Sequence, residues 1–416
     1  MTVNDSSAFD VLIAGGGCVG ATLACALGEV GFRVGLIEAR PPATDWPAGS
    51  VDLRVYAVTV ASQRIFENLD AWPGMLARGV SPYEAMEVWD AASGGRIRFD
   101  AAEIGEPVLG HIIEQRVMVA ALMERLEALP GVQRLCPAEV TDFETAGDAV
   151  RVRLGDGRQL GAKLLVAADG KGSRVRERAA IPVQRYDYRQ QAVVCVVSTE
   201  RPNPATAWQR FLAEGPLAFL PLADGRSSIV WSTTPEQAEE LCALDEAAFR
   251  ARLGEAFDYR LGAITAVGER ARFPLARQHA ERYVEPRLAL VGDAAHVIHP
   301  LAGQGVNLGL LDAAALAEVL AGTRERGRDI GGLSALRKYE RWRRGDNLAM
   351  MLAMDGFKHL FGSELPPLQR LRGLGLGLAD RLTPLKTLLV RHAMGLDGDL
   401  PALARPHISA AGAGLA

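Results

Sequence analysis

Short apolar runs alternate with amphipathic segments along the first part of the chain. Residues 9–14 are almost entirely apolar, as expected for a short strand that is buried on both faces of a parallel sheet. A glycine-rich turn and a helix-like segment follow, and residues 32–38 form a second apolar run. This strand–helix–strand order predicts a β-α-β unit, and hence a parallel sheet covered by helices.

Apolar and polar residues alternate one by one further along the chain. This alternation is found in residues 86–100, 150–160 and 192–233, and it predicts strands with one buried face. Gly155-Asp156-Gly157 interrupts the second of these segments and is typical of a hairpin turn. We therefore expect antiparallel strands in addition to the parallel sheet.

Helical patterns dominate the C-terminal part of the chain. A long Ala- and Leu-rich segment begins after Asn307, and helical patterns continue to about residue 396. The remaining residues, 397–416, are small and low in complexity, which predicts a flexible tail.

Composition and charge exclude several classes of protein. At roughly 150 residues per domain, a chain of 416 residues predicts two or three domains. A net charge of −4 disfavours a nucleic-acid partner. No uncharged apolar stretch approaches the roughly 18 residues of a membrane span, and the N-terminus lacks the features of a secretory signal. Five scattered cysteines predict neither a disulfide framework nor a zinc site, and they fit a reducing cytosol.

The C-terminal helical region is basic within this acidic chain. Residues 337–396 contain eleven Lys or Arg against five Asp or Glu. Two interpretations stay open: a solvated helix face, or a peripheral docking surface for anionic lipid. The second rests on apolar residues among the charges, namely Met350, Met351, Leu352, Met354, Phe357, Leu360 and Phe361.

A Gly-x-Gly-x-x-Gly motif lies between the first strand and the first helix. Gly15 permits a tight turn, Gly17 allows the backbone to approach a pyrophosphate, and Gly20 lets helix and strand pack closely. Glu38 ends the second strand, where a carboxylate can bind both hydroxyls of an adenosine ribose. This combination predicts a dinucleotide site, and the carboxylate disfavours NADP in it.

Two further segments place an aspartate after an apolar strand. Asp169 ends the strand of residues 164–168 and precedes a basic segment, although a simple N-capping role is an equal alternative. Asp293 ends a later strand, and glycines at 303 and 305 then open the long helix, where a flat ligand could lie against the backbone. His296 and His299 lack a third ligand nearby, so turn residues are favoured over a metal site.

The three glycine-bearing segments together resemble the group A flavoprotein monooxygenases, which use one FAD. Within them, the chain resembles the ubiquinone-biosynthesis hydroxylases of the UbiH/UbiF/UbiI group over about residues 9–396. The likeness is carried by GDAAHVIHPLAGQGVNLG and by residues 52–58, 86–90, 110–117, 218–225 and 228–238. Residues 86–90, 95–100 and 257–262 look most like the UbiI branch.

The resemblance implies a role for each candidate cofactor residue. Gly15, Gly17, Gly20 and Glu38 would hold the ADP half of FAD, with Arg54 and Gln115 nearer the flavin. Asp169 would lie near the pyrophosphate, and Asp293 would bind the ribityl chain. Pro300, Gly303, Gln304, Gly305, Val306 and Asn307 would line the isoalloxazine edge. The chain departs from the family at Gln115, where an Asn is usual.

The resemblance also implies a fold and its division into domains. We expect an α/β fold with a Rossmann-like FAD-binding domain, a β-sheet substrate domain as in p-hydroxybenzoate hydroxylase, and a helical C-terminal extension. The FAD domain would comprise residues 1–80, 101–180 and 276–335; the substrate domain, 81–100 and 181–275; the helical region, 336–396.

The implied activity is that of an FAD-dependent aromatic monooxygenase. NAD(P)H or another donor would reduce the flavin, and a C4a-hydroperoxyflavin would transfer oxygen to the ring of a polyprenyl phenol. The UbiI-like segments imply hydroxylation of 2-polyprenylphenol at C5, giving 2-polyprenyl-6-hydroxyphenol, with a later UbiF- or UbiH-like step as the alternative. Because the cofactor supplies the reactive group, we name no catalytic side chain.

The substrate is expected under the strands of the second domain. Candidate pocket residues are Phe211, Phe219, Leu220, Pro221 and Trp231, and ordinary core positions are an equal alternative for each. An insoluble polyprenyl tail would fit a cytoplasmic enzyme docked on the inner face of the cytoplasmic membrane, in a complex with other ubiquinone-biosynthesis proteins.

Other functions share parts of this pattern. A soluble hydroxylase of small aromatic acids would have the same FAD motifs but no reason for a basic, apolar C-terminus. A flavin-dependent halogenase would show a WxWxIP segment, which is absent. A non-catalytic FAD-holding subunit would not consume NADH, and a prenyl-chain reductase would not use O2.

Overall fold

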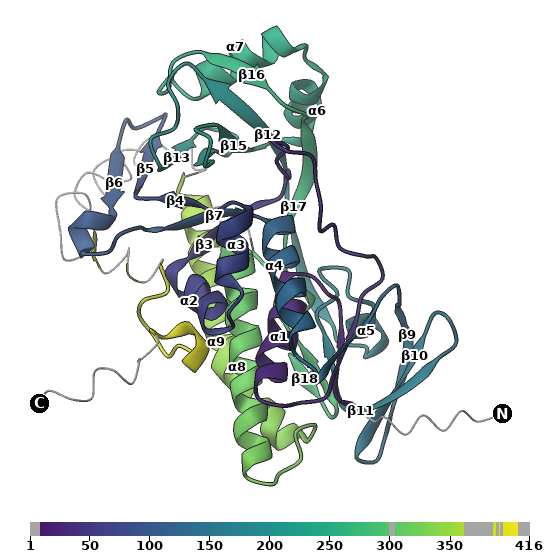
Figure 1. The fold of residues 1–416 in the computed structure, drawn as a ribbon. Coiled ribbons are helices and arrows are strands. Elements are labelled where there is room, and N and C mark those ends of the chain that lie inside the picture. The colour runs from purple at the N-terminus through teal and green to yellow at the C-terminus, as the bar shows by residue number, and fades with distance from the viewer. Residues whose placement is uncertain (1–8, 299–303, 362–385, 388–390, 392–393, 407–416) are drawn as a thin grey trace, which may run out of the picture.

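The computed structural model describes residues 9–298, 304–361, 386–387, 391 and 394–406. A sheet with a parallel centre forms one half of it (Figure 1). Its main strand order is β18-β19-β11-β1-β2-β8, and β10 and β9 extend it in antiparallel fashion from β11. The strands are β1 (Phe9–Ala14), β2 (Val34–Ile37), β8 (Val132–Leu135), β9 (Val140–Ala146), β10 (Ala149–Leu154), β11 (Gln159–Ala167), β18 (Val284–Glu285) and β19 (Leu288–Leu290).

Strand β1 is apolar because helices and neighbouring strands enclose it, and Val11, Leu12 and Ile13 are fully buried. Helix α1 (Cys18–Glu29) contacts both α4 (Gln115–Glu127) and α8 (Gln304–Glu325). The predicted hairpin at Gly155–Gly157 joins β10 to β11 in antiparallel register.

A second, mostly antiparallel sheet forms the other half. Its order is β20-β17-β12-β15-β14-β13-β5-β6, with β16 beside β12. The strands are β5 (Ala85–Asp90), β6 (Arg96–Asp100), β12 (Val183–Thr199), β13 (Thr206–Phe211), β14 (Pro216–Pro221), β15 (Ser227–Thr233), β16 (Ile264–Val267), β17 (Ala271–Ala280) and β20 (His296–Val297). Helices α6 (Pro235–Ala243) and α7 (Glu246–Ala256) pack on one face of this sheet over a separate hydrophobic core.

A small sheet lies between the two large ones (Figure 1). It consists of β3 (Val55–Thr59), β7 (Gly110–Glu114) and β4 (Ser81–Tyr83), with β7 in the centre. Helices α2 (Val60–Asn68) and α3 (Trp72–Arg78) follow β3, and the Thr59 hydroxyl caps α2 by accepting a hydrogen bond from the Ser62 amide. Short helices complete the connections: η1 (Ala101–Ile104), α5 (Arg174–Arg178) and η2 (Gly292–Ala294).

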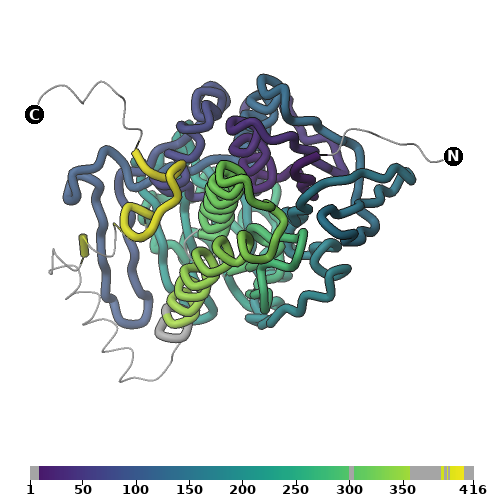
Figure 2. Tube along the Cα trace, turned by 90° about the horizontal axis from the view of Figure 1, so that it is seen from below, coloured from purple at the N-terminus to yellow at the C-terminus, as the bar shows by residue number. Residues whose placement is uncertain are grey.

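Helix α9 (Leu333–Phe361) packs beside α8, and the two run together along one side of the molecule (Figure 2). By length and composition α8 could cross a membrane, but 67% of its most apolar window is buried, as in a core helix.

The tail departs from the sequence-based expectation within its described part. Residues 402–404 form the 3-10 helix η4 (Ala402–Ala404), which packs on α2 and α8. Asn68 donates a side-chain hydrogen bond to the Leu403 carbonyl at 2.8 Å, and Ala404 is fully buried. The prediction of a flexible tail is therefore wrong for these residues, because small residues here fill a packed surface rather than a linker.

Candidate functional site

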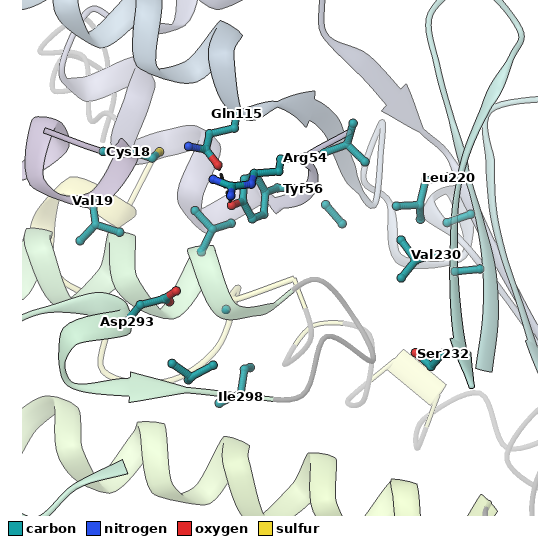
Figure 3. A pocket seen from close by; sticks show the side chains of 18 of the residues that line it. Cys18, Val19, Arg54, Tyr56, Gln115, Leu220, Val230, Ser232, Asp293 and Ile298 are labelled. Atoms are coloured by element: carbon teal, nitrogen blue, oxygen red, sulfur yellow. Dashed lines mark hydrogen bonds between the residues drawn. The ribbon is translucent and has the colours of Figure 1, made fainter. Parts of the chain in front are cut away.

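A cavity of about 500 Å³ lies between the two large sheets. That volume is within the usual range for a ligand site, roughly 300–1,000 Å³. One wall consists of the β1–α1 turn, strand β3, the end of β11, the η2 turn and the start of α8. The opposite wall is formed by β5, β13, β14 and β15, and Figure 3 shows Asp293 and Leu220 on the two sides.

The β1–α1 turn has the shape that a pyrophosphate requires. Gly15 has φ +107°, and a Cβ on Gly20 would lie 1.9 Å from the Gly15 carbonyl oxygen, so neither position admits a side chain. At Gly17, by contrast, an added Cβ would meet no protein atom within 4 Å. Gly17 lines the cavity at the N-terminus of α1, where free amides and the helix dipole favour an anion.

Glu38 lies at the end of β2, as predicted, and holds the turn. Its Oε2 accepts a hydrogen bond from the Gly16 amide at 2.7 Å, and its Oε1 accepts one from the Arg40 amide at 3.0 Å. Glu38 is half-buried and lies next to the turn rather than in the cavity wall. This is the position from which a carboxylate can reach the adenosine ribose.

Arg54 and Gln115 both line the cavity, and they come together with a residue that sequence reasoning missed. The Tyr56 hydroxyl donates a hydrogen bond to Gln115 Oε1 at 3.1 Å (Figure 3), and the backbone N–H of Gln115 donates to the Arg54 carbonyl at 2.9 Å. Burial, and secondarily the nearby Asp293, raises the pKa of Tyr56, so it stays protonated. The sequence signal that could have found Tyr56 is its place two residues after Arg54, within the segment 52–58 that carries the family resemblance.

Asp169 follows β11 and lies beside the cavity-lining Ala168 and Gly170. Its Oδ2 accepts a hydrogen bond from the Val175 amide at 3.3 Å, whereas Oδ1 is buried and has no partner within the described residues. The cap of α5 is Ser173, not Asp169. An unpaired buried carboxylate oxygen costs free energy unless a ligand or water satisfies it.

Asp293 lies in the η2 turn with its carboxyl toward the cavity (Figure 3). Asp293 is exposed where it lines the cavity, yet the surrounding protein takes water away from the carboxyl and raises its pKa, against the lowering influence of His296 and Lys171. Gly292 has φ +57°, and a Cβ on Gly309 would lie 2.7 Å from Val19 Cγ2. These glycines let α1, the η2 turn and α8 meet closely behind Asp293.

The start of α8 forms the adjacent part of the same wall. Gly305 and Val306 line the cavity. The Asn307 side chain points elsewhere: its Oδ1 accepts hydrogen bonds from the Thr59 amide at 3.0 Å and the Ser62 hydroxyl at 2.8 Å, and its Nδ2 donates to the Ala57 carbonyl at 2.8 Å. Asn307 therefore fixes the end of the helix against β3 and α2. Gln304 begins α8; Pro300, Gly303 and His299 lie outside the described residues.

Behind Asp293, His296 belongs to a buried polar network whose other members the sequence did not single out. His296 Nε2 lies 2.5 Å from Asp312 Oδ2, which also accepts a hydrogen bond from the Gly292 amide at 3.1 Å. Asp312 Oδ1 accepts from Arg343 Nε and Asn347 Nδ2, both at 3.0 Å. Burial alone would raise the pKa of Asp312, but His296 and Arg343 lower it overall.

Apart from Leu220, the residues of β14 and β15 that line the cavity are neighbours of the predicted ones. Ala218 and Leu220 of β14 and Val230 and Ser232 of β15 line the cavity. Phe219, Pro221 and Trp231 are buried and have the opposite orientation, since successive side chains alternate between faces. Phe219 stacks on Phe257 at 3.6 Å and belongs with Trp231 to the core beneath α6 and α7.

These three residues are therefore core positions, and their assignment to the substrate pocket does not fit this cavity. Phe211 does lie on the cavity-facing side of its sheet, but it packs against Val88 and Met354 instead of lining the cavity. Of the five candidates, Leu220 is the one that the cavity includes.

The cofactor wall fits a flavin dinucleotide. This wall combines open space at Gly17, an unpaired Asp169 oxygen beside the cavity-lining Ala168 and Gly170, and the cavity-facing Asp293, which are the kinds of group that a bound FAD would satisfy. The apolar sheet opposite leaves room for a second, apolar molecule.

Comparison with known proteins agrees with this fit. A family model described as an FAD binding domain matches residues 8–346. The chain is 39% identical over 387 residues to the 3-demethoxyubiquinol 3-hydroxylase of Escherichia coli K12, covering 93% of this chain and 98% of that protein. It is 41% identical over 386 residues to the ubiquinone hydroxylase UbiL of Rhodospirillum rubrum, covering 93% and 89%.

Among solved structures, p-nitrophenol 4-monooxygenase PnpA from Pseudomonas putida DLL-E4 superposes with a TM-score of 0.76 at 20% identity, covering 94% of this chain and 98% of that one. That likeness concerns the fold. With the family model over most of its length and relatives of this identity, the chain belongs to the FAD-dependent monooxygenases of the ubiquinone-hydroxylase group, and FAD is its cofactor.

Proposed function

We propose that this monooxygenase hydroxylates the aromatic ring of a polyprenyl phenol in ubiquinone biosynthesis. The observation that carries the proposal is the cavity, which has a dinucleotide-binding wall on one side and a largely apolar sheet on the other. An electron-rich ring held between them would face the flavin, while its apolar tail needs only an apolar path out. The names of the two relatives support the same substrate class.

The overall reaction consumes the phenol, O2 and a reduced donor such as NAD(P)H, and it yields the hydroxylated ring, water and the oxidised donor. Bound FAD supplies the chemistry that activates O2. The residues of this chain would hold and orient the cofactor: the amides at the start of α1 would bind the pyrophosphate, Asp293 would bind the ribityl chain, and the start of α8 would lie at the flavin edge. The amides there favour negative charge that develops on the ring system.

Exclusion of water is the other task of this site. Met86, Ala207, Leu220 and Val230 form an apolar surface on the substrate side. A dry cavity strengthens the electrostatic interactions inside it and prevents wasteful side reactions of reactive oxygen species.

Two ring positions compete within this proposal. The UbiI-like segments favour C5 hydroxylation of 2-polyprenylphenol, giving 2-polyprenyl-6-hydroxyphenol. The 39% identity to a 3-demethoxyubiquinol 3-hydroxylase favours a later hydroxylation of a methoxylated quinol. Pocket shape decides between them, since both substrates carry the same tail.

Complementation separates the two steps. The chain would be expressed in one E. coli strain that lacks its 3-demethoxyubiquinol 3-hydroxylase and in another that lacks the C5 hydroxylase, and ubiquinone would be measured by mass spectrometry. A third strain would lack the UbiH-type hydroxylase. Rescue of one strain identifies the step. The Asp293→Ala variant should rescue none, because the proposed ribityl contact is lost; failure of the wild-type chain in all three strains would contradict the proposal.

We also propose that the enzyme is cytoplasmic and docks on the inner face of the membrane through α9. Three arginines and two leucines follow one exposed stripe of this helix at spacings of three and four: Arg337, Arg341, Arg344, Leu348 and Leu352. Basic side chains attract anionic lipid, and apolar ones insert into the interface. A membrane-soluble substrate would then enter the enzyme without crossing water.

Some residues of the basic C-terminal region cannot belong to the proposed docking face. Lys386 is buried and pairs with Glu103 at 2.7 Å, and Met351 is buried as well, so neither contributes to a docking face. Arg370, Arg372 and Arg381 lie outside the described residues, as do the side chains of Phe357, Leu360 and Phe361.

A further inference from the structure

The face of β13, β14 and β15 that lines the cavity is apolar with two exceptions. Its apolar members include Ala207, Ala218, Leu220 and Val230. The exceptions are Gln209 on β13 and Ser232 on β15. The polar groups of the opposite wall are assigned to FAD in the proposed function. Gln209 and Ser232 therefore need a different hydrogen-bond partner.

Neither exception is used by the protein itself. Within the described part of the chain, the Gln209 amide and the Ser232 hydroxyl form no hydrogen bond with another side chain or with the backbone. Gln115 and Tyr56 across the cavity, by contrast, bind each other. A polar group in an apolar wall costs free energy when it is left unpaired, which points to a ligand that satisfies it.

Gln209 has the better position of the two. Its Cα pairs with Val88 on β5 and Ala218 on β14, and Ala218 pairs in turn with Val230 on β15. The small Ala218 leaves space beside the long amide side chain in the middle of the wall. Ser232 lies two strands away and further along β15, more than about 10 Å from Gln209 by sheet geometry, so one ring oxygen cannot bind both.

Apolar packing flanks Gln209 on both sides along β13. Towards Phe211, Val88 and Met354 of α9 pack against Phe211, and towards Ala207, Tyr83 and Met394 belong to the same cluster as Ala207. A ring that enters the cavity therefore meets one amide on the otherwise apolar cavity face of β13.

We propose that Gln209 is a specificity-determining residue whose side-chain amide binds the ring oxygen of the phenol. This inference rests on the proposed function. The amide carbonyl can accept a hydrogen bond from a phenol, and the amide NH2 can donate to a phenolate, so the contact survives ionisation of the substrate. Holding the oxygen fixes which ring carbon faces the flavin, because electrophilic attack is directed relative to that oxygen.

The test compares two ligands on FAD-loaded proteins. The probes are 2-prenylphenol and its methyl ether, and binding is measured from the change in flavin absorption. In the wild-type enzyme we expect the phenol to bind about tenfold more tightly, because a buried amide that loses its hydrogen bond weakens binding by roughly that factor. The Gln209→Met variant keeps the length of the side chain and loses its amide, and its preference for the phenol should fall to about twofold or less. The two proteins and two ligands together form a double-mutant cycle that isolates the contact between the amide and the phenol.

Three variants act as controls. Ser232→Ala and Gln133→Met, the latter on the distant strand β8, should keep the wild-type preference. Gln209→Leu provides a second substitution if Gln209→Met loses flavin. A preference that Gln209→Met and Gln209→Leu retain, or one that Ser232→Ala removes, overturns the assignment of Gln209. A wild-type enzyme that holds FAD and binds neither probe overturns the proposed function instead, so the two failures are distinct.

Discussion

Gly17 and Gly20 belong to one motif but differ in what surrounds them. A Cβ on Gly20 would lie 1.9 Å from the Gly15 carbonyl oxygen, whereas one on Gly17 would enter open space beside the cavity. We therefore expect Gly20→Ala to lower the melting temperature of the apoprotein and to abolish FAD binding. Gly17→Ala should keep the apoprotein's melting temperature and weaken FAD binding at least tenfold, since its methyl occupies the pyrophosphate's approach.

Calorimetry of the apoproteins and titration with FAD distinguish these outcomes. Gly172→Ala is the matched control, because its Cβ would also meet no atom within 4 Å. Equal loss of stability in Gly17→Ala and Gly20→Ala would contradict the assignment of Gly17 to the ligand.

Two buried histidines predict how stability depends on pH. Burial lowers the pKa of His111 and of His279 to about 4. Both are thus neutral in the folded protein at pH 5, whereas an unfolded histidine with a pKa near 6.5 binds a proton there. Because the unfolded state binds more protons between pH 6.5 and 4, the free energy of unfolding should decrease as the pH falls through that window.

Each such histidine adds at most about 1.4 kcal/mol per pH unit to the slope of the free energy of unfolding against pH. The substitution His111→Phe removes one titrating group beside Trp72, whose ring lies 5.0 Å away. Urea unfolding from pH 4 to 7 should then show a shallower slope than the wild type. An identical slope would mean that His111 does not become protonated on unfolding in this range.

At the scale of elements, Asp312 joins α8 to the η2 turn, β20 and α9. Its carboxylate accepts hydrogen bonds from Gly292 and Arg343, among others, and is fully buried. Removing it leaves Arg343 without its buried partner, which typically costs about 3–5 kcal/mol. We expect Asp312→Ala to lower the free energy of unfolding by that amount and to release FAD, since the turn carries Asp293.

The control is Asp156→Asn in the exposed β10–β11 hairpin, which should leave the urea midpoint unchanged. The stabilisation by Asp312 also depends on pH. The folded pKa of Asp312 lies below its usual 3.8, so its contribution is present above that value and is lost as the pH falls through the folded pKa. A variant as stable as the wild type at pH 7 would contradict this role.

The elements themselves could be predicted from local patterns, but their contacts could not. The β1–α1 turn with Glu38 and the hairpin at Gly155–Gly157 follow from motifs within some 30 residues. Asp312 and Arg343, however, are 31 residues apart in the chain, on α8 and α9, and only the packing of these two helices brings them together. Likewise, Phe219 and Ala218 are neighbours on β14 whose side chains point to opposite faces of the sheet. Which of the two faces the cavity depends on which face α7 covers.

At the scale of the whole molecule, the two sheets were foreseeable and the cavity wall was not. Continuous apolar runs predict the parallel sheet, and alternation predicts the antiparallel one. The small sheet of β3, β7 and β4 joins segments about 50 residues apart, and it places Tyr56 in the cavity. Nothing local marks such a junction, because each of its strands is too short to specify its partners alone.

The exposed stripe of α9 makes a prediction about the whole enzyme. Replacing Arg337, Arg341 and Arg344 by Glu removes three positive charges from one face and adds three negative ones. Since each basic residue near an anionic surface contributes about 1 kcal/mol, binding to vesicles of 30% phosphatidylserine should weaken by at least tenfold at low salt, with flavin content unchanged. Leu348→Ser with Leu352→Ser should weaken the part of the binding that persists at high salt, because it removes the inserting side chains.

The control for the arginine variant carries the same charge change on the β10–β11 hairpin, at Arg151, Arg153 and Arg158, away from α9 in Figure 1. If this control loses as much binding as the α9 variant, net charge rather than α9 accounts for the attraction; if neither loses binding, α9 is a solvated face.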